Sequence, residues 1–259
     1  MNLLNNPKRA LIIIMGALFL IGFGIANFYY SLANSSVDPR VIEARELYSK
    51  YDSYTENSNF KGIFNLLDSI ENIYNSIEHY SNSFEVGVLY NNRAAAYLSM
   101  AIYFKNNSLS LNGKTTLTKD TLLVLAENAA LQSIKIYENW LGNFSNLPDS
   151  IIKVKVKYNF LNGLNGYSPK ENDRFISKRV SEIKDAQLET PRRLSVAYTN
   201  LGTINRHMEN YDKTIKYYEK AIELWDRNLT AQNNLNKLLD RPLKKQNMLQ
   251  KLFPPDKEK

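Results

Sequence analysis

Residues 195–228 read SVAYTNLGTINRHMENYDKTIKYYEKAIELWDRN, and this stretch decides the fold. Apolar and small side chains recur in both halves at spacings of three and four, which predicts helices at 190–208 and 211–227. Part of the second half, NYDKTIKYYEKAI at 210–222, shares its residue pattern with an earlier segment, NFKGIFNLLDSIE at 59–71. Both begin with Asn and an aromatic residue and then place apolar or small side chains at matching positions. This similarity between the two segments indicates an internal repeat built from helical hairpins.

Helical patterns also fill most of the remaining chain beyond residue 37. Asp38-Pro39 predicts a helix start, because Asp can cap free N–H groups and Pro loses nothing at the first helical position. Thr190-Pro191 predicts another start by the same chemistry. The other expected elements are a first helix that ends near residue 54, helices at 60–79, 84–104, 121–140 and 230–239, and a polar loop at 105–120.

The segment IKVKVKY at 152–158 allows two interpretations. It alternates with period two like a strand, whereas Ile151, Val154, Tyr158 and Leu161 lie at helical spacing. A strand needs a partner, and the sequence offers no second candidate to pair with this one. The pattern therefore favours a helix, and the predicted fold class is all-α.

The net charge of +7 is concentrated at the two ends of the chain. Lys8 and Arg9 supply two positive charges and the basic tail at 241–259 a surplus of four, which leaves +1 for everything between them. A near-neutral body has no large electrostatic footprint for a phosphate backbone, so nucleic acid is not expected as a partner. The absence of cysteine excludes disulfides, a thiolate nucleophile and a cysteine-rich zinc site.

A membrane anchor is predicted at 10–33, after a short basic tail at 1–9. The 21 residues at 10–30 are almost wholly apolar and match the roughly 20 needed for a helix to span a bilayer core. The alternative is a cleaved signal peptide, because Ser31-Leu32-Ala33 offers small residues at the spacing of a cleavage site. The apolar run exceeds the roughly 7–15 residues of a signal peptide, which favours the retained anchor.

The basic residues on either side of the apolar run help to predict how the anchor is oriented in the membrane. Lys8 and Arg9 directly precede the run, and a short basic leader tends to stay in the cytoplasm. We therefore predict a single-pass inner (plasma) membrane protein with a cytoplasmic N-terminus and a periplasmic helical domain at 38–240. Three basic residues at 40–50 also lie within reach of the far end, so counting Lys and Arg does not fix the orientation.

Residues 195–228 resemble one tetratricopeptide (TPR) repeat. They comprise 34 residues, with Leu201-Gly202 in the first helix and Tyr218 and Ala221 in the second. Gly202 and Ala221 are expected where the two helices approach most closely. The departures from the family pattern are Tyr198 for the usual Trp, Asn205 for the usual Tyr, Thr214 for the usual first Ala and Asp226 for the usual Pro.

Two further segments resemble the same repeat less closely. The unit at 87–140 places Tyr90, Ala94 and Tyr97 at the expected spacings and carries an insertion near 105–120. A degenerate unit at 44–77 would contain the similar segment at 59–71 in its second helix. The resemblance thus implies a TPR-like right-handed α-solenoid of antiparallel helix pairs behind one N-terminal transmembrane helix.

The resemblance also implies a binding surface, because the inner helices of TPR proteins line a concave groove that binds peptides or partner helices. The carboxylate clamp of chaperone adaptors is disfavoured, since Thr199 and Thr203 stand where that clamp needs Lys and Asn. The expected groove residues are Val196, Thr199, Thr203 and Arg206, continued by Asn233 and Lys237, and on the earlier unit Asn91, Ala95 and Leu98.

No catalytic constellation is apparent in the sequence. The two histidines, His79 and His207, stand alone, and there is no glycine-rich phosphate loop and no His-Glu-x-x-His motif. We therefore expect a protein that is not an enzyme and has neither a cofactor nor a metal.

Two functions fit these expectations. The first is a membrane-anchored scaffold for protein–protein interactions in a cell-envelope assembly, similar to the TPR proteins that form a collar around some bacterial flagellar motors. The second is a chaperone-like or translocon-associated TPR module that binds exported polypeptides. Other proteins and the membrane are the expected partners, and self-association into a homo-oligomer is left open.

Overall fold

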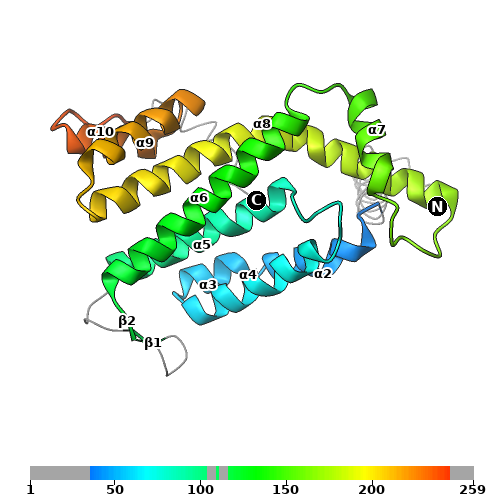
Figure 1. The fold of residues 1–259 in the computed structure, drawn as a ribbon, viewed down its shortest axis with the longest axis horizontal. Coiled ribbons are helices and arrows are strands. Elements are labelled where there is room, and N and C mark those ends of the chain that lie inside the picture. The colour runs from blue at the N-terminus through cyan, green and yellow to red at the C-terminus, as the bar shows by residue number, and fades with distance from the viewer. Residues whose placement is uncertain (1–35, 104–108, 111–115, 246–259) are drawn as a thin grey trace, which may run out of the picture.

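The computed structural model describes residues 36–103, 109–110 and 116–245, whose regular elements are all helices apart from two very short strands (Figure 1). The elements in chain order are the 3-10 helix η1 (Pro39–Val41), α2 (Ile42–Tyr48), α3 (Tyr51–Glu56), α4 (Phe60–Asn75), α5 (Phe84–Ile102), β1 (Leu109–Ser110), β2 (Thr116–Leu117), α6 (Lys119–Phe144), α7 (Asp149–Asn159), α8 (Pro169–His207), α9 (Tyr211–Leu224) and α10 (Leu229–Leu238).

The helix start at Asp38-Pro39 is confirmed. Asp38 accepts a hydrogen bond from the backbone N–H of Arg40 at 3.0 Å, and Pro39 occupies the first helical position. The expected first helix is nevertheless divided into η1, α2 and α3. Arg40 then fastens this segment to the end of α7, because its guanidinium donates to the carbonyls of Phe160 at 2.7 Å and Asn162 at 2.5 Å.

Helix also prevails over strand at 152–158, which lies within α7. Ile152, Val156 and Phe160 are fully buried, whereas Val154 and Tyr158 are exposed, as expected for a helix with one face toward the core. Within the expected loop at 105–120, β1 and β2 form an antiparallel pair that aligns Leu109 with Leu117.

The predicted helix start at Thr190-Pro191 is wrong. Pro191 lies inside α8, which begins at Pro169 and continues to His207. The true start carries a full capping box: Ser168 Oγ accepts from the Glu171 N–H, and the Glu171 carboxylate accepts from the Ser168 N–H at 2.8 Å. A start at Thr190 would place Arg193 in the position of that glutamate, so no capping box could form there.

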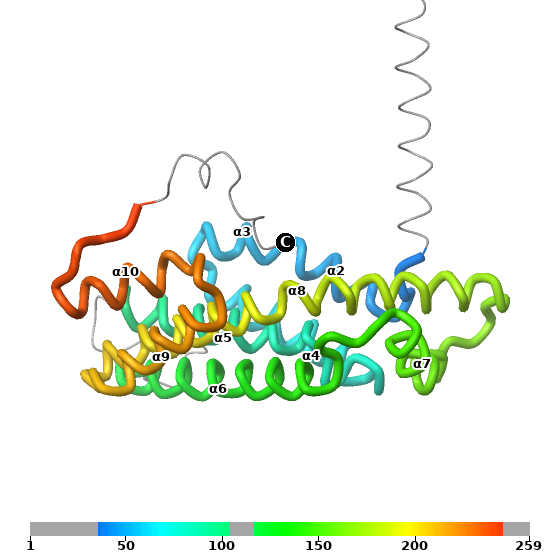
Figure 2. The backbone as a smooth tube through the Cα atoms, turned by 90° about the horizontal axis from the view of Figure 1, so that it is seen from above, coloured from blue at the N-terminus to red at the C-terminus, as the bar shows by residue number. Residues whose placement is uncertain are grey.

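The helical hairpins stack side by side, consistent with a TPR-like α-solenoid. The long α8 connects the whole stack, because it contacts α5, α6 and α7 as well as α9 and α10 (Figure 1). Figure 2 shows α2, α3 and α10 on one side of the molecule and α6 on the other. The first half of α8, together with α7, fills the region at 147–189 for which the sequence offers no repeat match.

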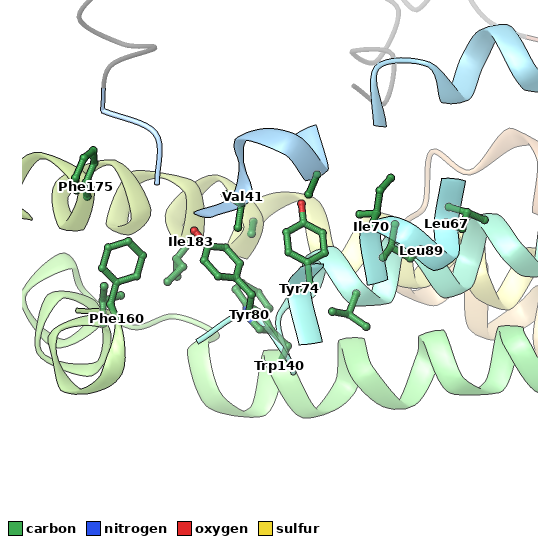
Figure 3. Close-up of a cluster of buried hydrophobic side chains, with 14 of the residues drawn as sticks. Val41, Leu67, Ile70, Tyr74, Tyr80, Leu89, Trp140, Phe160, Phe175 and Ile183 are labelled. Atoms are coloured by element: carbon green, nitrogen blue, oxygen red, sulfur yellow. The ribbon is translucent and has the colours of Figure 1, made fainter. Parts of the chain in front are cut away.

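Two apolar clusters hold the stack together. The first joins α2, α4, α7 and the first half of α8, and Figure 3 shows Tyr74 and Tyr80 with their rings close together, near Trp140. The ring centroids of these tyrosines lie 5.7 Å apart. The second cluster joins α5, α6 and the second half of α8. Burial of this much apolar area is the main favourable contribution to folding.

The expected close approach of the last two repeat helices is confirmed. A Cβ atom on Gly202 would come within 2.6 Å of Tyr218 Cε1, and Ala221 is fully buried. The hairpin of α5 and α6 uses the same arrangement, because a Cβ on Gly87 would come within 2.5 Å of Tyr137 Cε1. A glycine beneath a tyrosine ring therefore sets the helix spacing in both hairpins.

The predicted membrane anchor at 10–33 and the basic N-terminal tail at 1–9 lie outside the described residues. Among the helices that the structure does describe, none is long and apolar enough to cross a bilayer.

Candidate partner-binding cleft

Three of the inner helices, α2, α5 and α8, enclose a cleft of about 450 Å³ with Tyr74 of α4. These helices contribute to the first halves of the three predicted repeat units, although the α8 residues of the cleft precede the unit at 195–228. The residues that line the cleft are Arg45, Tyr48, Tyr74, Phe84, Glu85, Val88, Leu89, Lys178, Glu182, Asp185, Ala186, Glu189 and Arg193.

The cleft combines an apolar floor with a charged rim. Tyr74, Leu89 and Ala186 are buried at its base, while Phe84 and Val88 are half-buried. Seven of the thirteen lining residues are charged, so a ligand of the cleft would meet charged groups as well as the apolar base. Tyr74, Leu89 and Ala186 belong to the first apolar cluster, so the base of the cleft is part of the packed core.

Arginine residues pair with three of the carboxylates in the cleft. Arg45 Nη2 lies 2.6 Å from Glu182 Oε1, and Arg179 Nη1 lies 2.5 Å from Glu85 Oε1. Burial disfavours the charge on Glu85, yet the adjacent Arg179 guanidinium holds the pKa of that carboxyl below its usual value. Asp185 stays exposed at the rim. On the α8 wall, Glu182 pairs with Arg45 and Glu189 with Arg192, and Lys178 and Arg193 add positive charge beside Asp185.

Arg179 is itself buried, with a side chain only 2% exposed. Its guanidinium lies 4.3 Å from the centroid of the Tyr80 ring, and its Nε donates to His79 Nε2 at 3.1 Å. Burial and the nearby Arg179 charge lower the pKa of His79 to about 4, which keeps the imidazole neutral at physiological pH. His79 and Arg179 also line a second hollow, of about 740 Å³, bounded by α6, α7 and α8.

The match to known families falls on the last complete hairpin. Residues 195–228 match the family model described as Tetratricopeptide repeat. The chain carries a tetratricopeptide repeat. No curated protein and no solved structure matches the chain. TPR repeats mediate binding to other proteins, so the family match indicates a protein–protein interaction module.

The predicted groove residues of this TPR repeat differ in how deeply the structure buries them. Val196, Thr203 and Arg206 are half-buried on α8. Thr199, by contrast, is buried and accepts a hydrogen bond from Asn228 Nδ2 at 2.9 Å, so it supports the start of α10 and cannot contact a partner. Thr203 Oγ1 pairs with the hydroxyl of Tyr218 at 3.1 Å.

The predicted groove residues on α5 lie mostly inside the protein. Asn91 is buried and its Oδ1 accepts from Asn200 Nδ2 at 3.0 Å, which joins α5 to α8. Leu98 is buried in the second apolar cluster, and only Ala95 is half-buried. Asn91 and Leu98, like Thr199, are thus buried by neighbouring helices and are not exposed along a groove.

The predicted groove residues on α10 remain accessible. Lys237 is exposed, and the half-buried Asn233 already binds a backbone segment. Its Nδ2 donates to the Lys244 carbonyl at 3.0 Å, and its Oδ1 accepts from the Lys244 N–H at 2.7 Å. The segment bound to Asn233 belongs to the chain itself.

Sequence reasoning missed the residues of the cleft. Its α8 wall comes from the region at 147–189 that resembles no repeat, and its other walls come from α2 and α5. A usable signal existed, since Glu182, Asp185 and Glu189 lie at spacings of three and four and share one helix face. Among the described residues, no group of three or more His, Cys, Asp or Glu could hold a metal ion.

Proposed function

We propose that the chain is a non-enzymatic scaffold that binds an extended segment of another protein in the cleft between α2, α5 and α8. The observation that supports this is the cleft itself, with its apolar floor and charged rim on the inner helices of a chain that carries a TPR repeat. A partner side chain would fill the apolar floor, and the charges at the rim would select its flanking residues.

The proposal includes attachment to a membrane through the apolar run at 10–33. Confinement to the membrane plane would raise the effective concentration of the scaffold for partners in the same membrane. A place in a cell-envelope assembly such as a motor collar stays a prediction, as do the absence of catalysis and the periplasmic location.

Proximity crosslinking of the full-length protein in its native membrane, followed by mass spectrometry, tests this function. We expect Val88→Glu to lose the partners, because Val88 lines the cleft, whereas Val124→Glu on the outer helix α6 should keep them. Equal recovery by both variants would place the partner elsewhere. A variant without residues 1–33 tests the contribution of the anchor.

The identity of the recovered proteins separates the two candidate functions. A few partners at fixed ratio, lost without the anchor, support the scaffold. A broad set of exported polypeptides supports the chaperone-like alternative instead, and recovery of cytoplasmic proteins alone contradicts the predicted orientation.

A further inference from the structure

The chain beyond α10 turns back along the helix that it has just left. Asp240 adopts a left-handed conformation with φ of 51°, and the Arg241 N–H donates to the Asn236 carbonyl at 2.7 Å, which closes the helix with a Schellman-type turn. Asn236 Nδ2 then donates to the Pro242 carbonyl at 3.0 Å. The reversal is visible in Figure 2 at the end of α10.

The direction of this returning segment follows from its contacts. It meets Asn236 through Pro242 and Asn233 through Lys244, so it runs antiparallel to α10. Its direction along α8 then depends on how α10 lies on α8.

The helices α10 and α8 run in the same direction. Asn228, at the start of α10, donates to Ser195 Oγ at 2.8 Å, and Asn234, further along, donates to Thr203 Oγ1 at 3.4 Å. The returning segment therefore advances toward lower residue numbers on α8. The cleft lies ahead of it in that direction, since α8 lines the cleft with residues 178–193.

The residues that follow Lys245 combine apolar side chains with a positive charge, which complements the apolar floor of the cleft and the carboxylate of Asp185 at its rim. Residues 246–253 read QNMLQKLF and place four apolar side chains within six residues, around Lys251. Leu252 and Phe253, at the far end of the segment, would suit the apolar floor of the cleft. Lys251 would suit the exposed carboxylate of Asp185, whereas Glu189 already pairs with Arg192. The apolar residues are Met248, Leu249, Leu252 and Phe253.

The length of this segment is also sufficient. The eight residues at 246–253 cover roughly 26–29 Å when extended. Along α8, the 18 residues that separate Thr203 from Asp185 correspond to about 27 Å at the rise of an α-helix. Phe253 can therefore reach the cleft from the point where Asn233 holds Lys244.

We propose that the C-terminal segment at 246–253 docks in the cleft between α2, α5 and α8 of its own chain. Asn233 acts as the guide that holds Lys244 and sets the direction of the tail. This inference rests on the proposed function in one respect: an external partner of the cleft would have to displace the tail, which makes the tail an autoinhibitory segment.

Photo-crosslinking of the full-length chain tests the docking. Phe253 is replaced by p-benzoylphenylalanine, and crosslinked peptides are mapped by mass spectrometry. We expect crosslinks within one chain to peptides that contain residues 45–48, 84–89 or 178–193. Crosslinks to other parts of the chain, or only to a second copy in a mixture of differently labelled chains, would overturn the proposal.

Two substitutions on α8 provide matched variants. Asp185→Lys should lower the intrachain yield several-fold, because it reverses a charge at the rim of the cleft, whereas Asp173→Lys should leave the yield unchanged. Both residues are exposed, and equal melting temperatures would verify the fold. Leu252→Asp in the tail should also lower the yield. Unchanged yields in Asp185→Lys and Leu252→Asp would contradict the docking.

This experiment measures only the contact between tail and cleft in the purified protein. Its failure leaves the recovery of external partners by the wild-type cleft untouched. Conversely, a positive result would stand even if Val88→Glu retained every external partner, in which case the cleft would serve the tail alone.

Discussion

Gly202 of α8 lies directly against the ring of Tyr218 of α9, so closely that a Cβ atom on Gly202 would come within 2.6 Å of Tyr218 Cε1. The ring is fully buried and its hydroxyl pairs with Thr203 Oγ1, so it has little freedom to move. The spacing of the two repeat helices is therefore fixed by the absence of one side chain.

We expect Gly202→Ala to lower the free energy of unfolding by about 1–3 kcal/mol, because overpacking against Tyr218 outweighs the gain in helix propensity. Urea unfolding followed by circular dichroism measures the change. Gly142→Ala on α6 is the matched control, since a Cβ there meets nothing within 4 Å. That control should stabilise the protein by about 0.5–1 kcal/mol. Equal effects of the two substitutions would contradict the close contact.

The buried ion pair of Arg179 and Glu85 supports the junction of α5 and α8. We expect Arg179→Met to cost about 3–5 kcal/mol of unfolding free energy, because Glu85 would remain buried without its counter-charge. The double variant Arg179→Met/Glu85→Leu should recover most of this loss. Lys184→Met, which breaks the exposed pair with Asp149, should stay within about 0.5 kcal/mol of the wild type. A double variant as unstable as the single one would show that the charge pair is not the cause.

The depressed pKa of His79 predicts that stability falls as the pH is lowered. The unfolded chain binds a proton with a pKa near 6.5, whereas the folded chain resists protonation until about pH 4. Between these values the unfolded state holds more protons, so acid favours unfolding. We expect a loss of about 2 kcal/mol between pH 7 and pH 5.

Urea unfolding at several pH values checks this dependence on His79. The variant His79→Gln keeps a hydrogen-bond acceptor for Arg179 but does not titrate, so its stability should change much less over the same range. His207→Gln is the comparison, because burial and nearby cations also lower the pKa of His207, but this residue lies outside the Arg179 network, at the end of α8. If the unfolding free energy of His79→Gln changed with pH as much as that of the wild type, His79 would not be the cause of the pH dependence.

Local patterns predict the shorter helices well. The Asn-aromatic start and the apolar spacing place α4 and α9 close to their observed bounds, because each presents one broad face to the core. The close approach at Gly202 can also be predicted from the local pattern, because a small residue at a core-facing position of a helix leaves room for the neighbouring helix.

The cleft could not be predicted in the same way. It needs α2, α5 and the first half of α8 to come together, and those segments are far apart in the sequence. Burial of Asn91 and Thr199 likewise depends on neighbouring helices, through the bonds from Asn200 and Asn228. Long-range packing, which no single segment encodes, decides which inner positions remain open.

Pro191 shows how an apparent helix start can lie inside a helix. The observed start at Ser168-Pro169 has a glutamate at the position that completes a capping box, whereas the predicted start at Thr190-Pro191 has none. The second lies inside α8, where Pro191 has no N–H to donate to the Gln187 carbonyl and the Thr190 hydroxyl is buried without a partner.

We therefore expect Pro191→Ala to raise the free energy of unfolding by about 1–3 kcal/mol, because it restores the missing donor in the interior of α8. Pro169→Ala is the matched control: at the first helical position proline costs nothing, so this change should be neutral or slightly destabilising. Urea unfolding of the two variants compares them directly. A loss of stability in Pro191→Ala would mean that proline at this position restricts the unfolded chain more than it weakens the helix.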